Sequence, residues 1–367
     1  MNDLEHNQNL HRYPVSFKWN KILANKNLSF YQKIIYKFFM FWARKSKYNP
    51  YDNTAFSQNQ IVDLASQIID KNQIDTVVVT GAPFNLLYFG AEIKKRNNIK
   101  LMLDYRDLWN GHPIFSKFQK LTQKQLDYCL YQERVALQSA DTVLAVDDGL
   151  KSQLIKLVDK SHHGKFHVIH NGYDVDDFYL DYPKTESQRI KIMFAGNIDA
   201  NLSNLVKSFV SCFKNLKSID SQIYEKFELI MHMKTNDKEL YEFLHAAVDN
   251  QFIVHDDFLP KDEYYKKLRE VQCGVFFLSE VYSDAFITKF SDFIVNENFI
   301  IQVGFEGECA KYLRDNKIGA TFEIGEGAAF FKKLKDVNFS TLYTNYDSLD
   351  FNLEKIAKKL KLLITKK

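Results

Sequence analysis

The feature that most constrains this chain is a regular alternation of short apolar runs with helical stretches. In the first half of the chain, helical patterns near 86–96 and 117–139, and from about residue 149, separate these runs. The strands expected here are Thr76–Thr80, Leu101–Tyr105, Thr142–Val146 and Phe166–His170. Short, fully apolar strands that alternate with helices predict a parallel sheet covered on both faces, with right-handed crossovers.

A second alternation begins after the polar stretch at 181–189. Its expected strands are Lys191–Gly196, Phe227–Met233, Phe252–Asp256, Cys273–Leu278 and Phe299–Val303. The chain of 367 residues is long enough for two domains. The predicted fold class is therefore α/β, with two Rossmann-like doubly wound domains that face a central cleft. Ligands in such folds bind at the carboxyl ends of the strands. The expected division is a mostly helical segment over 1–60, a first domain over 61–180, a second over 190–345 and a basic helix over 346–367.

Composition and motifs exclude several classes. The four cysteines are widely spaced, which argues against a disulfide framework or a zinc site and suits a reducing compartment. The ten histidines show no metal-ligand spacing. No apolar run approaches the length of about 18 residues that a membrane span needs, and the polar, acidic start is unlike a secretory signal. A P-loop motif is missing, and no complete G-x-G-x-x-G occurs.

The first fifty residues differ from the rest in charge. They hold nine Lys or Arg against two Asp or Glu, so the net charge of +3 leaves −4 for the remainder. They also contain eleven aromatic residues. One interpretation is a helix whose apolar face packs on the sheet. The other is an interfacial helix among anionic lipid headgroups. Nucleic-acid binding is disfavoured, because the basic segment is short and the bulk of the chain is slightly acidic.

The stretch SDAFITKFSDF at 283–293 is the first candidate site. It places Asp284 and Asp292 eight residues apart with Lys289 between them, after an apolar strand. A lysine beside a helix N-terminus can bind a diphosphate, and a carboxylate there can bind the two hydroxyls of a ribose. Helix capping with a surface lysine is the structural alternative.

Other candidates follow strands of both halves. Gly196 and Asn197 are expected at a strand–helix turn, where glycine lets the backbone approach a phosphate. Arg106 and Asp107 follow the strand that ends in LDY, where they could orient a hydroxyl acceptor or form an internal Arg–Asp bridge. The loop at 80–85 could bind an anion or simply cap a helix.

Taken in order, these segments resemble the GT-B glycosyltransferases, in particular the large retaining group related to family 4. The segments that carry the resemblance are TVVVTGAPFNLLYFGAEIKKR, LMLDYRDLW, ADTVLAVDDGLKSQL, KFHVIHNGYDVDDF, IKIMFAGNIDANLSNL, VQCGVFFLSE and ITKFSDFIVNENFIIQVG. Together they cover about residues 60–330. The resemblance implies transfer of a sugar from a nucleoside diphosphate sugar to a hydroxyl acceptor, with retention. It implies no permanently bound cofactor and no metal.

The resemblance also implies roles for single residues. Asp292 falls at the second acid of the family's E-x7-E motif, which holds the ribose, and Asp284 at the first, which lies by the donor sugar. Lys289 falls at a lysine common in this branch, where it would stabilise the departing diphosphate. Gly196 and Asn197 match the first glycine turn of the donor domain. Arg106 and Asp107 fall near the acceptor domain's His–Asp. Asn171 and Gly172 match the turn that begins the interdomain crossing.

The sequence departs from the family pattern in three places. Both motif acids are Asp rather than Glu, and no first strand with a glycine-rich loop is visible before residue 60. The usual Arg and Lys after the first donor-domain glycine are missing, and Lys234 could substitute for them.

The leading hypothesis is a cytoplasmic enzyme, peripheral at the inner membrane face through residues 1–50, that acts on a lipid-linked or surface-polysaccharide acceptor. A non-catalytic GT-B protein that serves a partner enzyme or binds a membrane is the alternative. A sugar-nucleotide epimerase is a third and weaker one.

Overall fold

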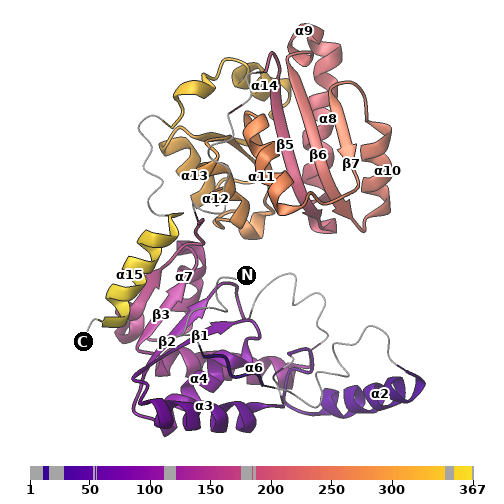
Figure 1. Cartoon of the computed structure of the whole chain (residues 1–367). Coiled ribbons are helices and arrows are strands. Elements are labelled where there is room, and N and C mark those ends of the chain that lie inside the picture. Colours follow the sequence, from indigo (N-terminus) through magenta and orange to yellow (C-terminus); the bar gives the residue numbers. More distant parts are fainter. Residues whose placement is uncertain are drawn as a thin grey trace. The chain divides into compact units, whose positions relative to one another are not determined.

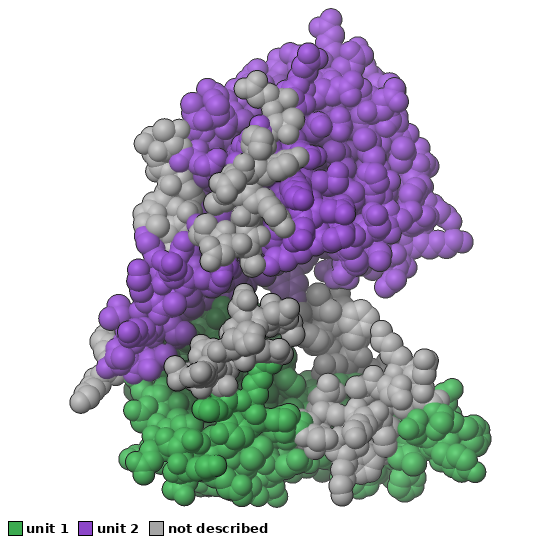
Figure 2. All heavy atoms as spheres, in the orientation of Figure 1, with its two compact units in different colours: residues 1–145, 150–167 green, residues 146–149, 168–367 purple. Residues whose placement is uncertain are grey.

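The computed structural model describes residues 11–15, 29–52, 54, 56–110, 121–174, 184, 187–343 and 351–365. The chain forms two compact units. Unit 1 comprises Met1–Ala145 and Leu150–His167, and unit 2 comprises Val146–Gly149 and Val168–Lys367 (Figure 2).

Unit 1 is built on a parallel sheet with the strand order β1-β2-β3-β4 (Figure 1). Its strands are β1 (Thr76–Gly81), β2 (Lys100–Tyr105), β3 (Thr142–Ala145) and β4 (Phe166–Val168), whose last residue belongs to unit 2. Its helices are α2 (Phe30–Lys45), α3 (Gln58–Asn72), α4 (Asn85–Arg96), α6 (Gln123–Ser139), α7 (Asp148–Ile155) and the 3-10 turn η2 (Lys160–Lys165). All four strands expected in this half are present. The part of the expected helix at 117–120 lies outside the described residues.

Seven of the described large side chains of α2 are exposed rather than packed on the sheet, so that interpretation of the first fifty residues is wrong for them. Those side chains are between 46% and 78% exposed, and they are Phe30, Tyr31, Ile34, Ile35, Phe38, Phe41 and Trp42. A capping box begins the helix at Ser29. Ala43, near its other end, is buried, and its carbonyl accepts a hydrogen bond of 3.2 Å from the Gln125 amide. Among the described helices, none combines the length and the apolar character that crossing a bilayer requires.

Unit 2 contains a six-stranded sheet in the order β10-β9-β8-β5-β6-β7, in which every neighbouring pair is parallel. Its strands are β5 (Ile190–Ile198), β6 (Phe227–Thr235), β7 (Phe252–His255), β8 (Cys273–Phe277), β9 (Phe299–Val303) and β10 (Gly319–Phe322). The α-helices are α8 (Ser203–Ile219), α9 (Ser221–Tyr224), α10 (Lys238–Ala246), α11 (Lys261–Glu270), α12 (Thr288–Val295), α13 (Glu308–Asp315), α14 (Ala328–Leu334) and α15 (Leu353–Thr365). The 3-10 turns are η4 (Ala200–Leu202), η5 (Glu280–Tyr282) and η6 (Phe339–Thr341).

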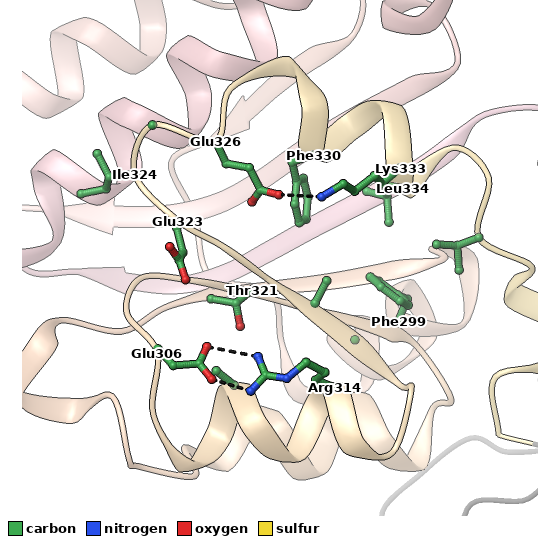
Figure 3. A pocket seen from close by; sticks show the side chains of 15 residues that line it. Phe299, Glu306, Arg314, Thr321, Glu323, Ile324, Glu326, Phe330, Lys333 and Leu334 are labelled. Atoms are coloured by element: carbon green, nitrogen blue, oxygen red, sulfur yellow. Dashed lines mark hydrogen bonds and ion pairs between the residues drawn. The ribbon is translucent and has the colours of Figure 1, made fainter.

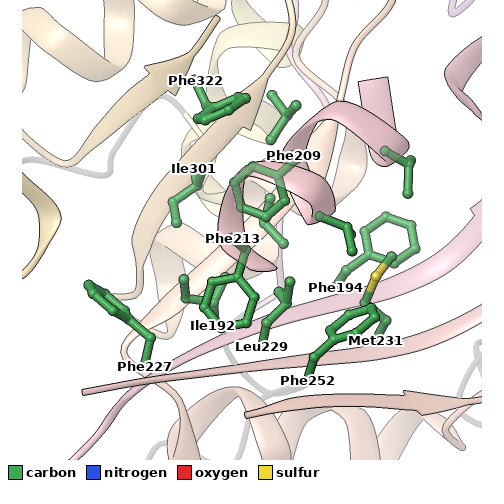
Figure 4. Packing of buried hydrophobic residues seen from close by; sticks show 14 of the residues in the cluster. Ile192, Phe194, Phe209, Phe213, Phe227, Leu229, Met231, Phe252, Ile301 and Phe322 are labelled. Carbon is green, nitrogen blue, oxygen red and sulfur yellow. The ribbon is translucent and has the colours of Figure 1, made fainter. Parts of the chain in front are cut away.

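Both faces of this sheet are covered, as the apolar strands predict. Along β8, Val275 and Phe277 join one core cluster, while Phe276 joins the cluster on the opposite face. On the first face, Phe209 of α8 packs edge-on against Phe322 of β10 at 5.1 Å (Figure 4). Each large apolar side chain buried in this way stabilises the fold by about 1.5–3 kcal/mol. A strand buried on both faces favours apolar residues, which is why β8 is a continuous apolar run.

Candidate functional site

The topological switch point of unit 2 lies between β5 and β8. Their sequence neighbours lie on opposite sides of this pair in the sheet, because β6 and β7 extend one way and β9 and β10 the other. The carboxyl ends of strands at such a point form a crevice where ligands bind in doubly wound folds. Gly196 lies near the end of β5, and α12 follows β8 in the chain.

Gly196 and Lys289 meet at this point. The Nζ atom of Lys289 fills the space that a Cβ atom at position 196 would occupy. The backbone of Gly196 has a φ of +151°, which side-chain-bearing residues rarely adopt. The backbone conformation therefore favours glycine at this position, and an added Cβ would also make the Lys289 ammonium move. The Lys289 Nζ also lies 4.8 Å from the centre of the Phe194 ring, in a cation–π contact.

The strand–helix turn that we expected at Gly196 and Asn197 is wrong in one respect. Strand β5 continues through both residues to Ile198, since β6 pairs with it as far as the match of Ile198 with Thr235. Gly196 therefore approaches Lys289 from within a strand, and Asn197 is exposed beside it.

Burial changes the acid–base behaviour of Lys289. Loss of solvent lowers its pKa from 10.5 to about 8, and the nearby Asp292 carboxylate partly opposes this change. Helix α12 begins at Thr288, and its N-cap residue Ile287 offers no side-chain hydrogen bond to the first turn. Lys289 thus belongs to the first turn of α12, and its ammonium group and the N-terminal amides of this helix both favour an anion.

Asp292 follows Lys289 on the next turn of α12. Its carboxylate accepts a hydrogen bond of 3.3 Å from the Tyr264 hydroxyl. The pKa of Tyr264 lies well above 10, because loss of solvent around the hydroxyl and the nearby Asp292 carboxylate both disfavour its charged form. The neighbouring Ser291 hydroxyl donates to the Asn171 carbonyl at 3.3 Å, which ties α12 to the segment at 170–173. The structure therefore brings Gly196, Lys289 and Asp292 together.

Asp284 has a structural partner elsewhere. The side chain is exposed, and one carboxylate oxygen accepts a hydrogen bond of 3.1 Å from the Glu308 backbone N–H. Glu308 is the first residue of α13, and the N-cap residue Gly307 has no side chain to supply this bond. The capping alternative thus applies to Asp284, although it caps α13 rather than α12.

Lys234 is not brought to Lys289 by the structure. It is exposed, and its Nζ lies 4.5 Å from the centre of the Phe258 ring. The register pairs Lys234 with Asn197 and not with Gly196, so its side chain leaves the sheet on the face opposite to the Gly196 position.

In unit 1, both segments for which the sequence left alternatives open have local partners. Arg106 Nε donates to Asp104 at 3.0 Å, which is the internal bridge, and Asp107 is exposed after β2. At the start of α4, the backbone N–H of Asn85 donates to an Asp52 carboxylate oxygen at 3.0 Å. The helix start that could have bound an anion is therefore occupied by a carboxylate of the chain itself.

One charged residue was missed from the sequence. Glu133 on α6 is fully buried, and its carboxylate accepts a hydrogen bond of 2.7 Å from the Asn110 amide. Burial raises its pKa from 4.5 to about 7. The Tyr105 hydroxyl at the end of β2 and the second Glu133 oxygen have no hydrogen-bond partner in the described part of the chain. Helical spacing from the buried residues Cys129 and Ala136 places position 133 on the inner face of α6, a signal that could have found it.

Unit 2 also has a hollow away from these residues. It has a volume of about 680 Å³ and lies beside the edge strand β10, α13 and α14 (Figure 3). Ion pairs of Glu306 with Arg314 and of Lys333 with Glu326 lie in its wall. Gly196, Lys289 and Asp292 do not line this hollow. The hollow is therefore separate from the candidate donor site.

The comparisons with known proteins agree with this architecture. The model of the family described as Glycosyltransferase Family 4 matches residues 40–177. No curated protein matches the sequence.

Among solved structures, sucrose-phosphate synthase from Thermosynechococcus elongatus is similar with a TM-score of 0.60 and 13% identity, over 86% of this chain and 79% of the other. Alpha,alpha-trehalose 6-phosphate synthase from Burkholderia multivorans is similar with a TM-score of 0.56 and 9% identity, over 86% and 77%. A trehalose-6-phosphate structure from E. coli, bound with UDP-2-fluoro glucose, has a TM-score of 0.53 and 10% identity, over 84% and 74%. The predicted resemblance to GT-B glycosyltransferases of the family 4 type is confirmed, and with it the predicted fold class.

Proposed function

We propose that this GT-B chain, whose residues 40–177 match glycosyltransferase family 4, moves a sugar from a nucleoside diphosphate sugar to a hydroxyl acceptor with retention at the anomeric carbon. The observation that carries the proposal is the meeting of Lys289 with Gly196 beside the start of α12. A half-buried lysine in the first turn of a helix, beside a glycine backbone, suits a diphosphate.

In this proposal the donor extends along α12. The diphosphate lies against Lys289, Gly196 leaves room for it, and the exposed Asn197 lies beside it. Asp292, on the next turn of the helix, accepts hydrogen bonds from the ribose hydroxyls. The bond from Tyr264 supports the last assignment, since it orients the Asp292 carboxylate.

The transfer step separates charge at the bond between the anomeric carbon and the diphosphate. That carbon–oxygen bond breaks, and its electron pair stays on the diphosphate. The acceptor oxygen bonds to the same face of the sugar, and its proton passes to a departing phosphate oxygen. Lys289 and the α12 amides stabilise the charge on the leaving group, which is the role a metal ion has in other transferases. We assign Asp284 to the donor sugar, in addition to its cap on α13, and Arg106 with Asp107 to the acceptor side.

For the acceptor we propose a lipid-linked glycan or polysaccharide precursor at a membrane surface. The support is α2, whose exposed aromatic and aliphatic side chains alternate with lysines and whose sixteen residues include no acid. Lys33, Lys37, Arg44 and Lys45 give it four positive charges. An exposed apolar face with basic residues favours the headgroup region of an anionic bilayer.

The donor assignment is tested by titrating UDP-, GDP- and dTDP-sugars into the protein and into two variants. Asp292→Ala removes the ribose contact, and Asp262→Ala is its control, an exposed acid in the first turn of α11. One donor should bind to the wild type and to the control alike, with affinity reduced at least about tenfold by Asp292→Ala. Equal binding to all three proteins would refute the assignment.

A non-catalytic role has one observation in its favour, which is the use of an Asp284 oxygen to cap α13. Incubation of the identified donor without acceptor separates the two functions. A transferase releases nucleoside diphosphate slowly, and the Lys289→Met variant should release less. Binding without any release, even when membrane extract supplies acceptors, would favour the non-catalytic role.

A further inference from the structure

Two histidines and an aspartate converge at the edge of the unit 2 sheet, apart from the donor residues. His232 on β6 is the register partner of His255, the last residue of β7. Their rings stack with centres 4.3 Å apart and an angle of 9° between the planes. Asp257 follows two residues after His255, and its carboxylate lies 3.5 Å from His232 Nδ1.

His232 is the unusual member of this group. It is only 4% exposed, yet both of its ring nitrogens lack a hydrogen-bond partner in the described part of the chain. A buried polar group without a partner destabilises the folded state. A ligand bound to a ring nitrogen of His232 would remove this cost.

The geometry of the three side chains suits a metal ion. One ligand atom from each of His232, His255 and Asp257 lies within 4.8 Å of the other two. Tetrahedral zinc with bonds of about 2.0–2.1 Å needs ligand atoms about 3.3 Å apart. His255 and Asp257 are both exposed, so their side chains are free to close this difference around the buried His232.

We propose that His232, His255 and Asp257 form a site for a divalent zinc-like ion. Imidazole nitrogens with one carboxylate oxygen are ligands that zinc accepts, and a fourth position stays open to water. The bound ion links β6, β7 and the turn that leads to α11. It lies outside the transfer step proposed above, so the family's implied absence of a catalytic metal does not conflict with it.

The charges around the site are mixed. Lys267 lies close enough to influence His232 and opposes a cation, whereas Asp257 favours one. Asp256 is engaged separately, because it bonds to His245 at 2.9 Å. The sequence alone does not indicate this site, because His232 and His255 are 23 positions apart and only the parallel register of β6 and β7 brings them together.

The test uses the full chain stripped of metal with a chelator and then dialysed. Zn²⁺ is titrated calorimetrically, and Co²⁺ is titrated by its visible absorption, which reports coordination directly. The wild type should bind one equivalent of each ion. His255→Gln and Asp257→Asn should each weaken binding by at least about tenfold. Both residues are exposed, so these variants retain the fold, and thermal unfolding checks this.

His245→Gln is the matched control, because this histidine belongs to the same unit and bonds to the neighbouring acid. It should leave zinc affinity unchanged. Asp292→Ala should do so as well, which keeps this test independent of the donor site. Failure of the wild type to bind one equivalent, undiminished affinity in His255→Gln, or loss of affinity in His245→Gln would each overturn the proposal.

Discussion

Glu133 in unit 1 and Lys289 in unit 2 are ionisable side chains of opposite sign, the first buried and the second half-buried. Burial in unit 1 raises the pKa of Glu133 to about 7, whereas partial burial in unit 2 lowers the pKa of Lys289 to about 8. Burial is the largest cause in both, because a low-dielectric surrounding disfavours the charged form of either group.

The difference lies in what surrounds each group. Lys289 has a glycine, an aromatic ring and a helix N-terminus around its ammonium. Glu133 has one amide and lies near the unpartnered Tyr105 hydroxyl. Unit 2 thus holds a cation ready for an anionic ligand, while unit 1 holds a carboxyl group that changes charge near neutral pH. Burial thus shifts the pKa of a side chain in both units. In unit 1 it favours the neutral form of an acid, and in unit 2 it favours the neutral form of a base.

The largest expected effect concerns the stability of unit 1. The folded pKa of Glu133 lies above its ordinary value of 4.5, so the folded state binds more protons than the unfolded state between these two values. This contribution is complete below pH 4.5 and is lost as pH rises through about 7, at a cost of roughly 3 kcal/mol. Glu133→Gln should remove this pH dependence. Hydrogen exchange of the β2 amides, from pH 5 to 8, measures it.

The amides of β5 are the internal control for that experiment. They belong to unit 2 and should respond to pH equally in wild type and variant. If Glu133→Gln left the pH dependence of exchange at β2 unchanged, Glu133 would not be the titrating group of unit 1. The contrast between Glu133 and Lys289 would then be wrong.

A somewhat smaller effect is expected at Gly196. An alanine there would put its Cβ into the position of the Lys289 ammonium and would strain a backbone with positive φ. We expect donor affinity to fall about 100-fold, or about 2.7 kcal/mol, and stability to fall by about 1–3 kcal/mol. Calorimetric titration and chemical unfolding measure the two effects.

Gly325→Ala separates these two causes. Gly325 also has positive φ, at +100°, but an added Cβ would meet nothing within 4 Å. It should cost stability while leaving donor affinity intact. Equal loss of donor affinity in both variants would mean that strain, and not displacement of Lys289, explains the Gly196 result.

The pH dependence of donor binding should be gentler. Lys289 carries its positive charge below about pH 8 and loses it above. Affinity for a nucleoside diphosphate should therefore be constant from pH 6 to 7.5 and then fall by at most about tenfold per pH unit. Titrations of the donor between pH 6 and 9.5 measure the profile. A profile that stayed flat to pH 9.5 would contradict the assignment of the ammonium to the diphosphate.

The smallest effect on stability is expected on α2. Phe38 is 74% exposed, so Phe38→Ser should change the free energy of unfolding by less than about 0.5 kcal/mol. It should nevertheless reduce flotation with liposomes that contain anionic lipid. A large loss of stability, or unchanged flotation, would show that α2 has another partner.

The sequence predicts the sheets well because burial on both faces leaves a direct signature. Strand β8 is apolar at all five positions, since two core clusters share its side chains. The sequence also places Lys289 and Asp292 together, because both lie on one helix, where spacing in sequence fixes spacing in space. The rest depends on distant partners. Asp284 caps a helix that begins 24 residues later, and Gly196 remains in a strand because β6 extends beside it.

Surface exposure was equally hard to read. The apolar pattern of α2 is compatible with packing on a sheet, and only the folded arrangement shows its aromatic residues exposed. The burial of Glu133 and His232 was equally hard to predict, because the residues around them come from segments far apart in the chain.

We propose that unit 2 binds a nucleotide sugar through the half-buried side chain of Lys289. The most direct test compares Lys289→Met with Lys234→Met by calorimetric titration of the donor. Both variants remove a positive charge near the carboxyl end of the same sheet, but only Lys289 lies against Gly196. We predict that Lys289→Met weakens binding at least about 100-fold, while Lys234→Met stays within about threefold of the wild type. Equal losses in the two variants, or no loss in Lys289→Met, would contradict the account.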